Sequence, residues 1–440
     1  MNVDLLIEAR WVVPVEPDGV VLENHAVAVK DGRIVAVMPR AQAAEAFTAT
    51  THRILDRHVL IPGLVNLHTH AAMSLLRGLA DDLPLHDWLQ NHIWPTEGRF
   101  VSPQFVHDGT RLAAAEMLRG GITCFNDMYF HPKSAAEAAL ESGIRAAIGI
   151  IVIDFPTPYA SDTDDYLAKG LAAREALRDE ALVSFCLAPH APYTVSDQSF
   201  ARVQTMAELL EVPIHVHVHE TQQEIDDGSQ AHGVRPLQRM RQLGLLGPGL
   251  IGVHSVHLTA EEIGLLAAHG CSVAHCPTSN LKLASGIAPV AELLAAGVSV
   301  GLGTDGAASN NRLDLFREMR LAALLAKGVS GRADVLPAHQ ALQMATLNGA
   351  RALGLEQEIG SIVVGKSADL CAVEFDDFVL SPCFDPLSHL IYVAGREHVS
   401  HVWVAGRARV EGGRLLGIDE SDLIRLASLW QNKIHPRDVE

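Results

Sequence analysis

The middle of the chain alternates short apolar runs with longer stretches rich in alanine and leucine. Apolar runs of this length between helical stretches are typical of parallel strands that helices cover on both sides. Eight runs predict strands at residues 59–70, 121–128, 144–154, 181–190, 212–219, 250–254, 271–275 and 298–305. Their regular spacing predicts an α/β protein in which residues 59–357 form a (βα)8 barrel.

The two ends of the chain have a different pattern. Residues 1–58 and 358–440 read as short alternating strands, with turn signals at Asp31–Gly32, Ala405–Gly406 and Gly412–Gly413. Because the two segments share this character, we expect them to form one small β domain together, although the whole barrel lies between them in the sequence.

Composition and charge restrict the class of protein. Hydrophobic residues make up 48% of the 440 residues and charged residues 20%, as in a folded globular protein. The net charge of −18 argues against nucleic acid and anionic membranes as partners. The six cysteines form no CxxC pair, which indicates reduced thiols. No secretory leader and no apolar run near the roughly 20 residues of a membrane span is visible, so we expect a cytoplasmic protein.

Ionisable residues gather at the carboxyl ends of the predicted strands, where barrels of this kind carry their active sites. Six strands end in or near such residues, namely His68 and His70, His190, the run from His215 to Glu220, His254, His275 and Asp305. One such histidine alone would be interpreted as a hydrogen-bonded core residue. Six strand ends together favour a functional site.

The histidines indicate a metal. His68 and His70 are two residues apart on one strand, so both side chains point to the same face. Two imidazoles from one strand, a third from another and a carboxylate are typical ligands of Zn²⁺ or Fe²⁺. The third imidazole stays open at this point, because His215, His217 and His219 share one face by the same alternation.

Three acidic residues are candidates for the same site. Asp305 ends the eighth strand among glycines, where the backbone turns sharply. Glu220 ends the fifth strand, although an acid there also suits a helix start. Glu97 lies in the first connection after the barrel begins, where a helix-capping role is the simpler interpretation. No lysine lies on the fourth strand to bridge two metals, and PCxxC, GxxxxGK[ST] and GxGxxG are absent. A single metal is therefore favoured.

Several segments resemble the amidohydrolase superfamily, and more closely its S-adenosylhomocysteine/5′-methylthioadenosine deaminases in the chlorohydrolase-like branch. They are PGLVNLHTHAAMSLLRGLADDLPLHDWLQNHIWPTE, HVHVHETQQE, CPTSNLKLASGIAPVAELLAAGVSVGLGTDGAASNN and ATLNGARALGLEQEIGSIVVGKSADL. The resemblance covers nearly the whole chain. It implies a TIM-type metal-dependent hydrolase barrel at 59–357, with a small β-sandwich made from residues 1–58 plus 358–440. It also implies one divalent metal ion per chain, with Zn²⁺ expected first and Fe²⁺ as the alternative.

The resemblance also implies a role for each site residue, because the HxxE motif of the family falls on His217 and Glu220. The implied metal ligands are His68, His70, His217 and Asp305. The implied catalytic residues are Glu220, His254 and Asp305. The implied substrate-binding residues are Glu97, His190, Glu220 and Asp305. The implied reaction is hydrolytic deamination of a small-molecule purine nucleoside, and we expect the enzyme to be a homo-oligomer, a dimer or a tetramer.

The chain departs from the family in one place. Some members carry arginines after the third strand that hold a substrate carboxylate, but no lysine or arginine occurs between Arg145 and Lys169. We therefore expect 5′-methylthioadenosine and adenosine to be better substrates than S-adenosylhomocysteine. The alternatives are a guanine or 8-oxoguanine deaminase or a triazine-type hydrolase on the same scaffold, and an inactive barrel, which a lost ligand would indicate. Every ligand position is filled here.

Overall fold

The computed structural model describes residues 1–435. Its internal contacts divide the chain into two compact units. The first contains Met1–Asn66, Glu116–Cys124 and Asp314–Ile418, and the second contains Leu67–Ala115, Phe125–Leu313 and the chain from Asp419 onward. Each unit is thus assembled from segments that are distant in sequence. The expected boundaries at 58/59 and 357/358 stay a prediction.

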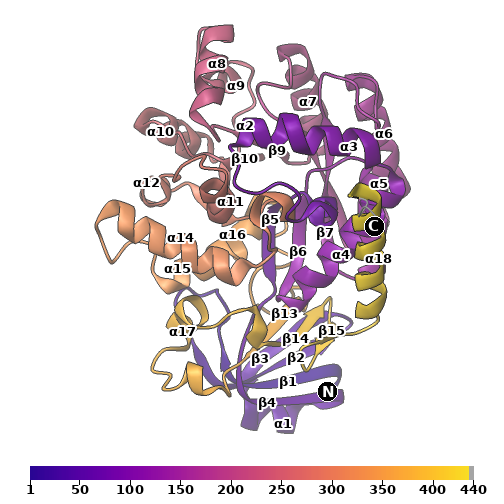
Figure 1. Ribbon diagram of the computed structural model, residues 1–440. Helices are drawn as coiled ribbons and strands as arrows, with labels where there is room; N and C mark the ends of the chain where they lie inside the picture. The colour runs from indigo at the N-terminus through magenta and orange to yellow at the C-terminus, as the bar shows by residue number, and fades with distance from the viewer. Residues whose placement is uncertain (436–440) are drawn as a thin grey trace. The chain divides into compact units, whose positions relative to one another are not determined.

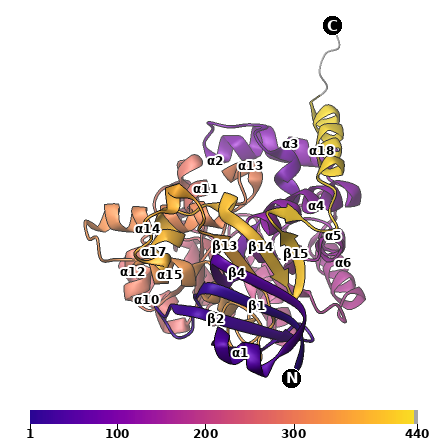
Figure 2. The same cartoon turned by 90° about the horizontal axis from the view of Figure 1, so that it is seen from below.

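Both ends of the chain contribute strands to one mixed sheet, in the order β16-β15-β14-β13-β4-β1-β2-β3 (Figure 2). The strands are β1 (Asn2–Val12), β2 (Leu22–Lys30), β3 (Arg33–Pro39), β4 (Thr48–Pro62), β13 (Leu370–Glu374), β14 (Val399–Val404), β15 (Arg407–Glu411) and β16 (Arg414–Leu415). Strand β1 pairs antiparallel with β2 and parallel with β4, and β4 pairs antiparallel with β13. The expected β domain made from both termini is confirmed.

Two glycine turns bring distant parts of this sheet together. The turn after β2 lies against the turn after β14, and a Cβ atom on Gly32 would lie only 2.7 Å from the carbonyl oxygen of Ala405. Gly32 also has a φ of 75°, which favours glycine. The strands enclose a shared apolar core that includes Ile7, Ile34 and Trp403. Both turns were expected from the sequence.

Eight parallel strands form the second sheet, in chain order (Figure 1). They are β5 (Leu64–Thr69), β6 (Ile122–Asp127), β7 (Arg145–Val152), β8 (Val183–Pro189), β9 (Ile214–Val218), β10 (Leu250–His254), β11 (Ser272–His275) and β12 (Ser299–Leu302). The backbone N–H of Asp305, just after β12, donates to the carbonyl oxygen of His68 in β5 at 3.0 Å. The last strand therefore meets the first, and the predicted barrel is confirmed.

The first predicted strand, 59–70, is wrong in one respect, because the structure divides it into two strands. Strand β4 ends at Pro62, which pairs with Leu370 of the mixed sheet, and β5 begins at Leu64. Gly63 lies between them, and a Cβ atom there would overlap the side chain of Thr123 at 2.1 Å. The apolar pattern continues through both strands, so periodicity does not reveal the change of sheet.

Helices connect the strands. They are α1 (Arg40–Ala46), α2 (Leu85–Asp87), α3 (Trp94–Phe100), α4 (Pro103–Arg119), α5 (Pro132–Ser142), α6 (Thr163–Ala176), α7 (Asp197–Leu210), α8 (Gln222–His232), α9 (Pro236–Gln242), α10 (Ala260–His269), α11 (Pro277–Lys282), α12 (Val290–Ala295), α13 (Ala307–Asn310), α14 (Leu315–Ser330), α15 (Ala338–Met344), α16 (Leu347–Ala352), α17 (Pro386–Tyr392) and α18 (Glu420–Ile434). Among the described residues, no helix combines the length and the apolar character that a bilayer span requires.

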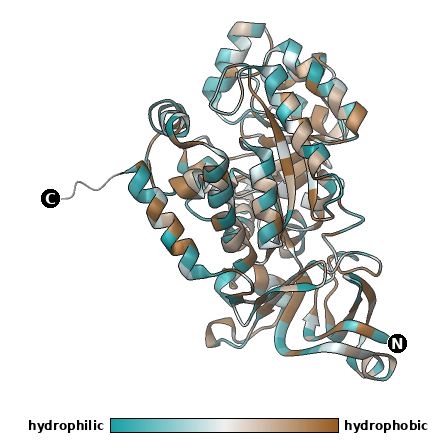
Figure 3. Ribbon diagram, turned by 90° about the vertical axis from the view of Figure 1, so that its right-hand side faces the viewer, coloured by the Kyte–Doolittle hydropathy of each residue, from teal (hydrophilic) through white to brown (hydrophobic). Residues whose placement is uncertain are grey.

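Helix α18 closes the described chain and carries both hydrophilic and hydrophobic residues along its length (Figure 3). Its buried residue Trp430 packs edge-on against Phe105 of α4, with ring centroids 5.2 Å apart. The indole N–H of Trp430 donates to Asp108 at 2.8 Å. The last helix of the described chain is thus fixed to α4, near the start of the barrel.

Candidate metal centre and active site

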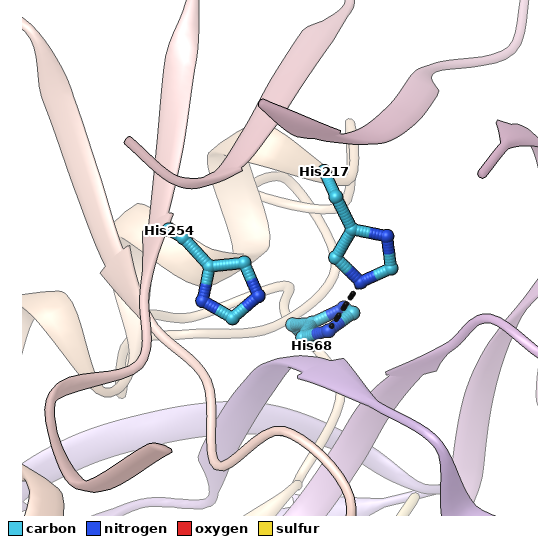
Figure 4. Close-up of side chains that lie close together, drawn as sticks. All are labelled: His68, His217 and His254. Carbon is cyan, nitrogen blue, oxygen red and sulfur yellow. Dashed lines mark hydrogen bonds between the residues drawn. The ribbon is translucent and has the colours of Figure 1, made fainter. Parts of the chain in front are cut away.

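The four predicted metal ligands meet at the carboxyl ends of the first, fifth and last barrel strands. Nε2 of His68 lies 3.2 Å from Nε2 of His217 and 3.4 Å from Oδ1 of Asp305. Nε2 of His70 lies 3.3 Å from the same carboxylate oxygen. Their ligand atoms form two overlapping groups able to hold a metal ion, His68 with His70 and Asp305, and His68 with His217 and His254. Figure 4 shows the second group, with the contact between His68 and His217 dashed.

Hydrogen bonds on the far sides of the rings fix which nitrogen faces the centre. Nδ1 of His70 lies 2.6 Å from the carbonyl oxygen of Met128, and Nδ1 of His217 lies 2.8 Å from that of His190. A carbonyl oxygen only accepts, so each Nδ1 carries the proton and each Nε2 presents a lone pair to the centre. Lone pairs that face one another and a carboxylate are stable only around a cation. The residues therefore fit a divalent metal such as zinc.

Burial favours the neutral form of two of the predicted ligands, His68 and His217. It lowers the pKa of His68 to about 4 and the pKa of His217 well below its ordinary value. Both side chains are nearly inaccessible to solvent, so a protonated ring would lose its hydration. Neutral imidazole is the form that binds a metal, and the site is ready for one without first releasing a proton.

The end of β6 fixes the strand end that carries His68 and His70. One carboxylate oxygen of Asp127 accepts hydrogen bonds from the Thr69 hydroxyl at 2.9 Å and from the backbone N–H of Ala71 at 2.7 Å. The N–H of Met128 donates to the carbonyl oxygen of Thr69 at 3.0 Å. These bonds lock the turn after β5, and with it the ring of His70.

Asp305 is held as a carboxylate. The N–H of Gly306 donates to Oδ1 at 2.7 Å, and the Ser279 hydroxyl donates to Oδ2 at 2.6 Å. Burial alone would raise the pKa of Asp305, but the hydrogen bond with His68 and the positive charge of nearby imidazoles when protonated hold it well below its ordinary value. Around neutral rings, a bound cation would lower it in the same direction. Its φ of 62° is in the left-handed region, a strained conformation that often occurs at functional sites.

The pKa of Glu220 is shifted in the opposite direction to that of Asp305. Its carboxyl group is buried, and this burial raises its pKa above the ordinary value. Oε2 lies 3.7 Å from Nε2 of His254, and Oε1 accepts a hydrogen bond from the Ser285 hydroxyl at 3.4 Å. Nδ1 of His254 lies 2.8 Å from the side-chain oxygen of Asn280, which fixes its proton on the far side of the ring. His254 therefore offers its free Nε2 toward the centre.

A cavity of about 270 Å³ opens over this centre and contains all the remaining predicted site residues. Its polar lining includes Glu97 and His190, and the Tyr129 hydroxyl donates to Oε1 of Glu97 at 2.6 Å. Burial raises the pKa of Glu97 to about 7 and lowers that of His190 to about 3. The apolar wall is formed mainly by Trp88, Ile93, Trp94, Ile151, Ile153 and Phe155. No lysine or arginine lines the described cavity.

Comparison with known proteins identifies the family of this chain. Residues 59–409 match the amidohydrolase family. The chain belongs to this family. The match covers the barrel together with β13, β14 and parts of β4 and β15 of the mixed sheet, so the resemblance read from the motifs is confirmed.

Individual relatives of this amidohydrolase are similar over their whole length. A 5-methylthioadenosine/S-adenosylhomocysteine deaminase of Saccharophagus degradans is 48% identical over 431 residues, 98% of this chain and 97% of the relative. A crystal structure of an adenosine deaminase from Xanthomonas campestris, with bound zinc, is 50% identical, with a TM-score of 0.98 over 99% of each chain. Atrazine chlorohydrolase from Arthrobacter aurescens reaches a TM-score of 0.88 at 24% identity, over 97% of this chain and 99% of its own, and shows the shared fold.

The three candidate histidines of the fifth strand occupy different positions relative to the metal ligands in this amidohydrolase. His217 faces the metal group, whereas His215 lies behind His68 with its Nε2 3.0 Å from Nδ1 of that ring. His219 lies outside the site, since it follows the end of β9 with a φ of 56° and accepts a hydrogen bond from the N–H of Leu237. The side-chain alternation that grouped the three histidines applies only within the strand, and His219 lies beyond its end.

Four residues of the site were not identified from the sequence. They are Tyr129, Asp127, Ser279 and Asn280. All four follow or end a barrel strand, in the segments NDMYF and CPTSN, and that position is the available signal. Their partners are specified only by the fold, because each acts on a residue from another segment of the chain. The roles of all the site residues, predicted and new, stay predictions.

Proposed function

We propose that this amidohydrolase is a zinc-dependent hydrolytic deaminase that converts 5′-methylthioadenosine and adenosine to the inosine analogues and ammonia. The observation that carries the proposal is the pair of carboxyl groups beside the metal group, a buried Glu220 with a raised pKa and an ionised Asp305. Two carboxyl groups whose pKa values are shifted in opposite directions suit a reaction that needs both a proton donor and a proton acceptor. The names of the relatives support the same activity.

The metal would be held by His68, His70, His217 and Asp305. A zinc ion there would supply a water molecule whose pKa falls from about 15.7 toward ~7, so that it attacks at neutral pH. Bound zinc in the Xanthomonas campestris relative supports the choice of metal.

The protein residues would move the protons. Asp305 accepts a proton from the attacking water, and Glu220 donates its proton to ring nitrogen N1, so that negative charge does not build up on the purine. His254 orients the water through its free Nε2 as the oxygen bonds to C6 of the ring. The proton on Asp305 passes to the amino group and the C6–N bond breaks. At the same time the C6 hydroxyl returns its proton to Glu220 and becomes the carbonyl, and ammonia leaves. Acid–base help of this kind contributes typically 10²–10⁴-fold.

The cavity supports a nucleoside with a neutral 5′ group. Oε1 of Glu97 is taken by Tyr129, which leaves Oε2 to accept hydrogen bonds from ribose hydroxyls, with His190 on the same cavity lining. Hydrogen bonds to a charged group contribute about 1.5–3 kcal/mol each. The apolar wall suits a methylthio group, whereas the amino-acid tail of S-adenosylhomocysteine finds no lysine or arginine in the described lining.

Rates of ammonia release test this proposal. We expect kcat/KM to be highest for 5′-methylthioadenosine and adenosine, lower for S-adenosylhomocysteine and lowest for adenine, which has no ribose. Glu97→Ala should remove most of the difference between adenosine and adenine. Guanine or 8-oxoguanine as the best substrate would overturn the proposal, as would an unchanged ratio in Glu97→Ala.

We also propose that the protein works as a cytoplasmic homo-oligomer, a dimer or a tetramer, on a small-molecule substrate. All six cysteines are free, which suits a reducing compartment. Light scattering on the purified protein tests the oligomeric state, and a monomeric mass would overturn that part of the proposal.

A further inference from the structure

His215 lies directly behind one of the four predicted metal ligands. It is in the middle of β9 and fully buried, two residues before His217. Its Nε2 is 3.0 Å from Nδ1 of His68, and the two rings meet edge to face at 72°, with centroids 4.9 Å apart. His215 does not line the cavity over the centre.

The direction of this hydrogen bond follows from the use of His68 as a ligand. Nε2 of His68 faces His217 and Asp305, so this nitrogen must present its lone pair to a metal. The ring proton then lies on Nδ1 and is donated to Nε2 of His215. His215 must in turn carry its own proton on Nδ1, and that nitrogen is buried without a hydrogen-bond partner among the described residues.

The other two ligand histidines are held differently. His70 and His217 each donate to a backbone carbonyl oxygen, which needs no special side chain. Of the three ligand histidines, only His68 has another imidazole as the hydrogen-bond partner of its Nδ1. A buried N–H without a partner lowers the stability of a fold, so the arrangement at His215 has no advantage for folding itself.

We propose that His215 is a positioning residue for the metal centre, which accepts the hydrogen bond of His68 and thereby fixes the tautomer and orientation of that ligand. The inference rests on the metal centre of the proposed function and not on its substrate. Loss of the outer hydrogen-bond partner of a ligand typically weakens metal binding 10–100-fold.

Zinc affinity and the stability of the metal-free protein together test this role. His215→Leu removes the acceptor, and His215→Gln places an amide oxygen near the position of Nε2. His275→Leu is the matched control. His275 is also a buried histidine on a barrel strand with an unpartnered Nδ1, but it makes no hydrogen bond to the four ligands in the described chain. Zinc affinity is measured by competition with a coloured chelator, and metal-free stability by thermal unfolding.

We expect His215→Leu to bind zinc 10–100-fold more weakly than the wild type, with no loss of metal-free melting temperature. His215→Gln should stay within a few-fold of the wild type, and His275→Leu should keep its zinc affinity. Wild-type zinc affinity in His215→Leu would overturn the inference. So would an equal loss in the leucine and glutamine variants together with a lower metal-free melting temperature, because that result indicates a structural role.

A measurement without substitutions gives a second test. Nitrogen NMR of the zinc-loaded, histidine-labelled protein should find His215 protonated at Nδ1, and protonation at its Nε2 would overturn the inference. These outcomes are separate from those of the proposed function. A wild-type protein that binds zinc but deaminates no purine would contradict the activity alone, and one that binds no zinc would overturn the metal centre and this inference with it.

Discussion

Glu220 and Asp305 carry the same functional group in one cavity, and their surroundings shift its pKa in opposite directions. Burial raises the pKa of Glu220, whereas at Asp305 the hydrogen bond with His68 and the positive charge of nearby imidazoles when protonated outweigh burial and lower the pKa. The difference arises from position, since Asp305 lies within 3.4 Å of two ring nitrogens and Glu220 lies 3.7 Å from one. Each residue is thereby suited to one direction of proton transfer.

The first prediction concerns Glu220→Gln. Glutamine has nearly the same shape but no proton of the required acidity, so kcat should fall about 10²–10⁴-fold while the metal content is unchanged. Steady-state kinetics and metal analysis check this. Glu208→Gln, the same change on the exposed surface of α7, should have wild-type kcat. A near-normal kcat in Glu220→Gln would mean that another group protonates the ring.

The second prediction concerns pH and Glu97. Its pKa is raised to about 7, so the carboxylate that binds ribose is lost as the pH falls through this value. Below about pH 7, kcat/KM for adenosine should therefore drop by up to about tenfold per pH unit. The hydrogen bond from Tyr129 lowers the pKa of Glu97, so Tyr129→Phe should move this drop to higher pH. A pH profile of kcat/KM for both proteins checks the direction, and a shift to lower pH would contradict it.

The sequence predicted these residues to different extents. His68, His70 and Asp305 could be placed because each stands at the end of an apolar run, where the chain itself marks the edge of the barrel. Tyr129 and Asn280 could not, since their roles depend on Glu97 and His254, which are distant in sequence. The tautomer of each histidine cannot be predicted from the sequence, because it depends on the hydrogen-bond partner on the far side of the ring.

At the scale of elements, the ends of strands are harder to predict than their middles. Strand β9 ends at Val218, and His219 leaves the extended conformation with a φ of 56°. The alternation of polar and apolar residues continues past that point, so the pattern does not reveal where the strand ends. Likewise, the apolar run through Gly63 hides the change from β4 to β5. Steric contacts with other segments cause these breaks, and such contacts are not encoded locally.

The third prediction concerns helix α18. Trp430 is buried against Phe105 and donates a hydrogen bond to Asp108, so Trp430→Ala should lower the free energy of unfolding by about 3–5 kcal/mol. Leu429→Ala is the matched control, because the neighbouring side chain is 50% exposed and its loss should change stability by less than about 0.5 kcal/mol. Denaturant unfolding checks both variants. Equal effects would contradict the packing of this helix.

At the scale of the whole molecule, the barrel was predictable because its eight strands repeat one pattern. Strand, helix and parallel strand follow one another with right-handed crossovers, which leaves few possible orders. The pairing of both termini in one mixed sheet was also indicated, since both terminal segments carry turn signals between alternating strands. The assignment of segments such as Asp314–Ile418 to one compact unit depends on three-dimensional contacts that no local pattern contains.

The fourth prediction concerns metal removal. Zinc would bind the folded state through residues of β5 and β9 and through Asp305 beyond β12, so it should stabilise the fold by about 4 kcal/mol when present at 1,000 times its dissociation constant. The melting temperature should fall when a chelator removes the metal and recover when zinc is added. His217→Ala should abolish most of this difference and most of the bound metal. Wild-type metal content in that variant would contradict the ligand assignment.

The seam of the barrel, where Asp305 meets His68, has a consequence for how the protein is made. The histidine pair of β5 leaves the ribosome early, whereas the carboxylate follows only after the last barrel strand. At about 5–20 residues per second, roughly 10 to 50 seconds separate the two events. A nascent or truncated chain that lacks β12 would offer imidazoles but no closing carboxylate, and we expect it to hold zinc weakly. With the proposed ligands, firm capture of the ion would mark a finished barrel, and the last ligand to be synthesised would serve as a check on completeness.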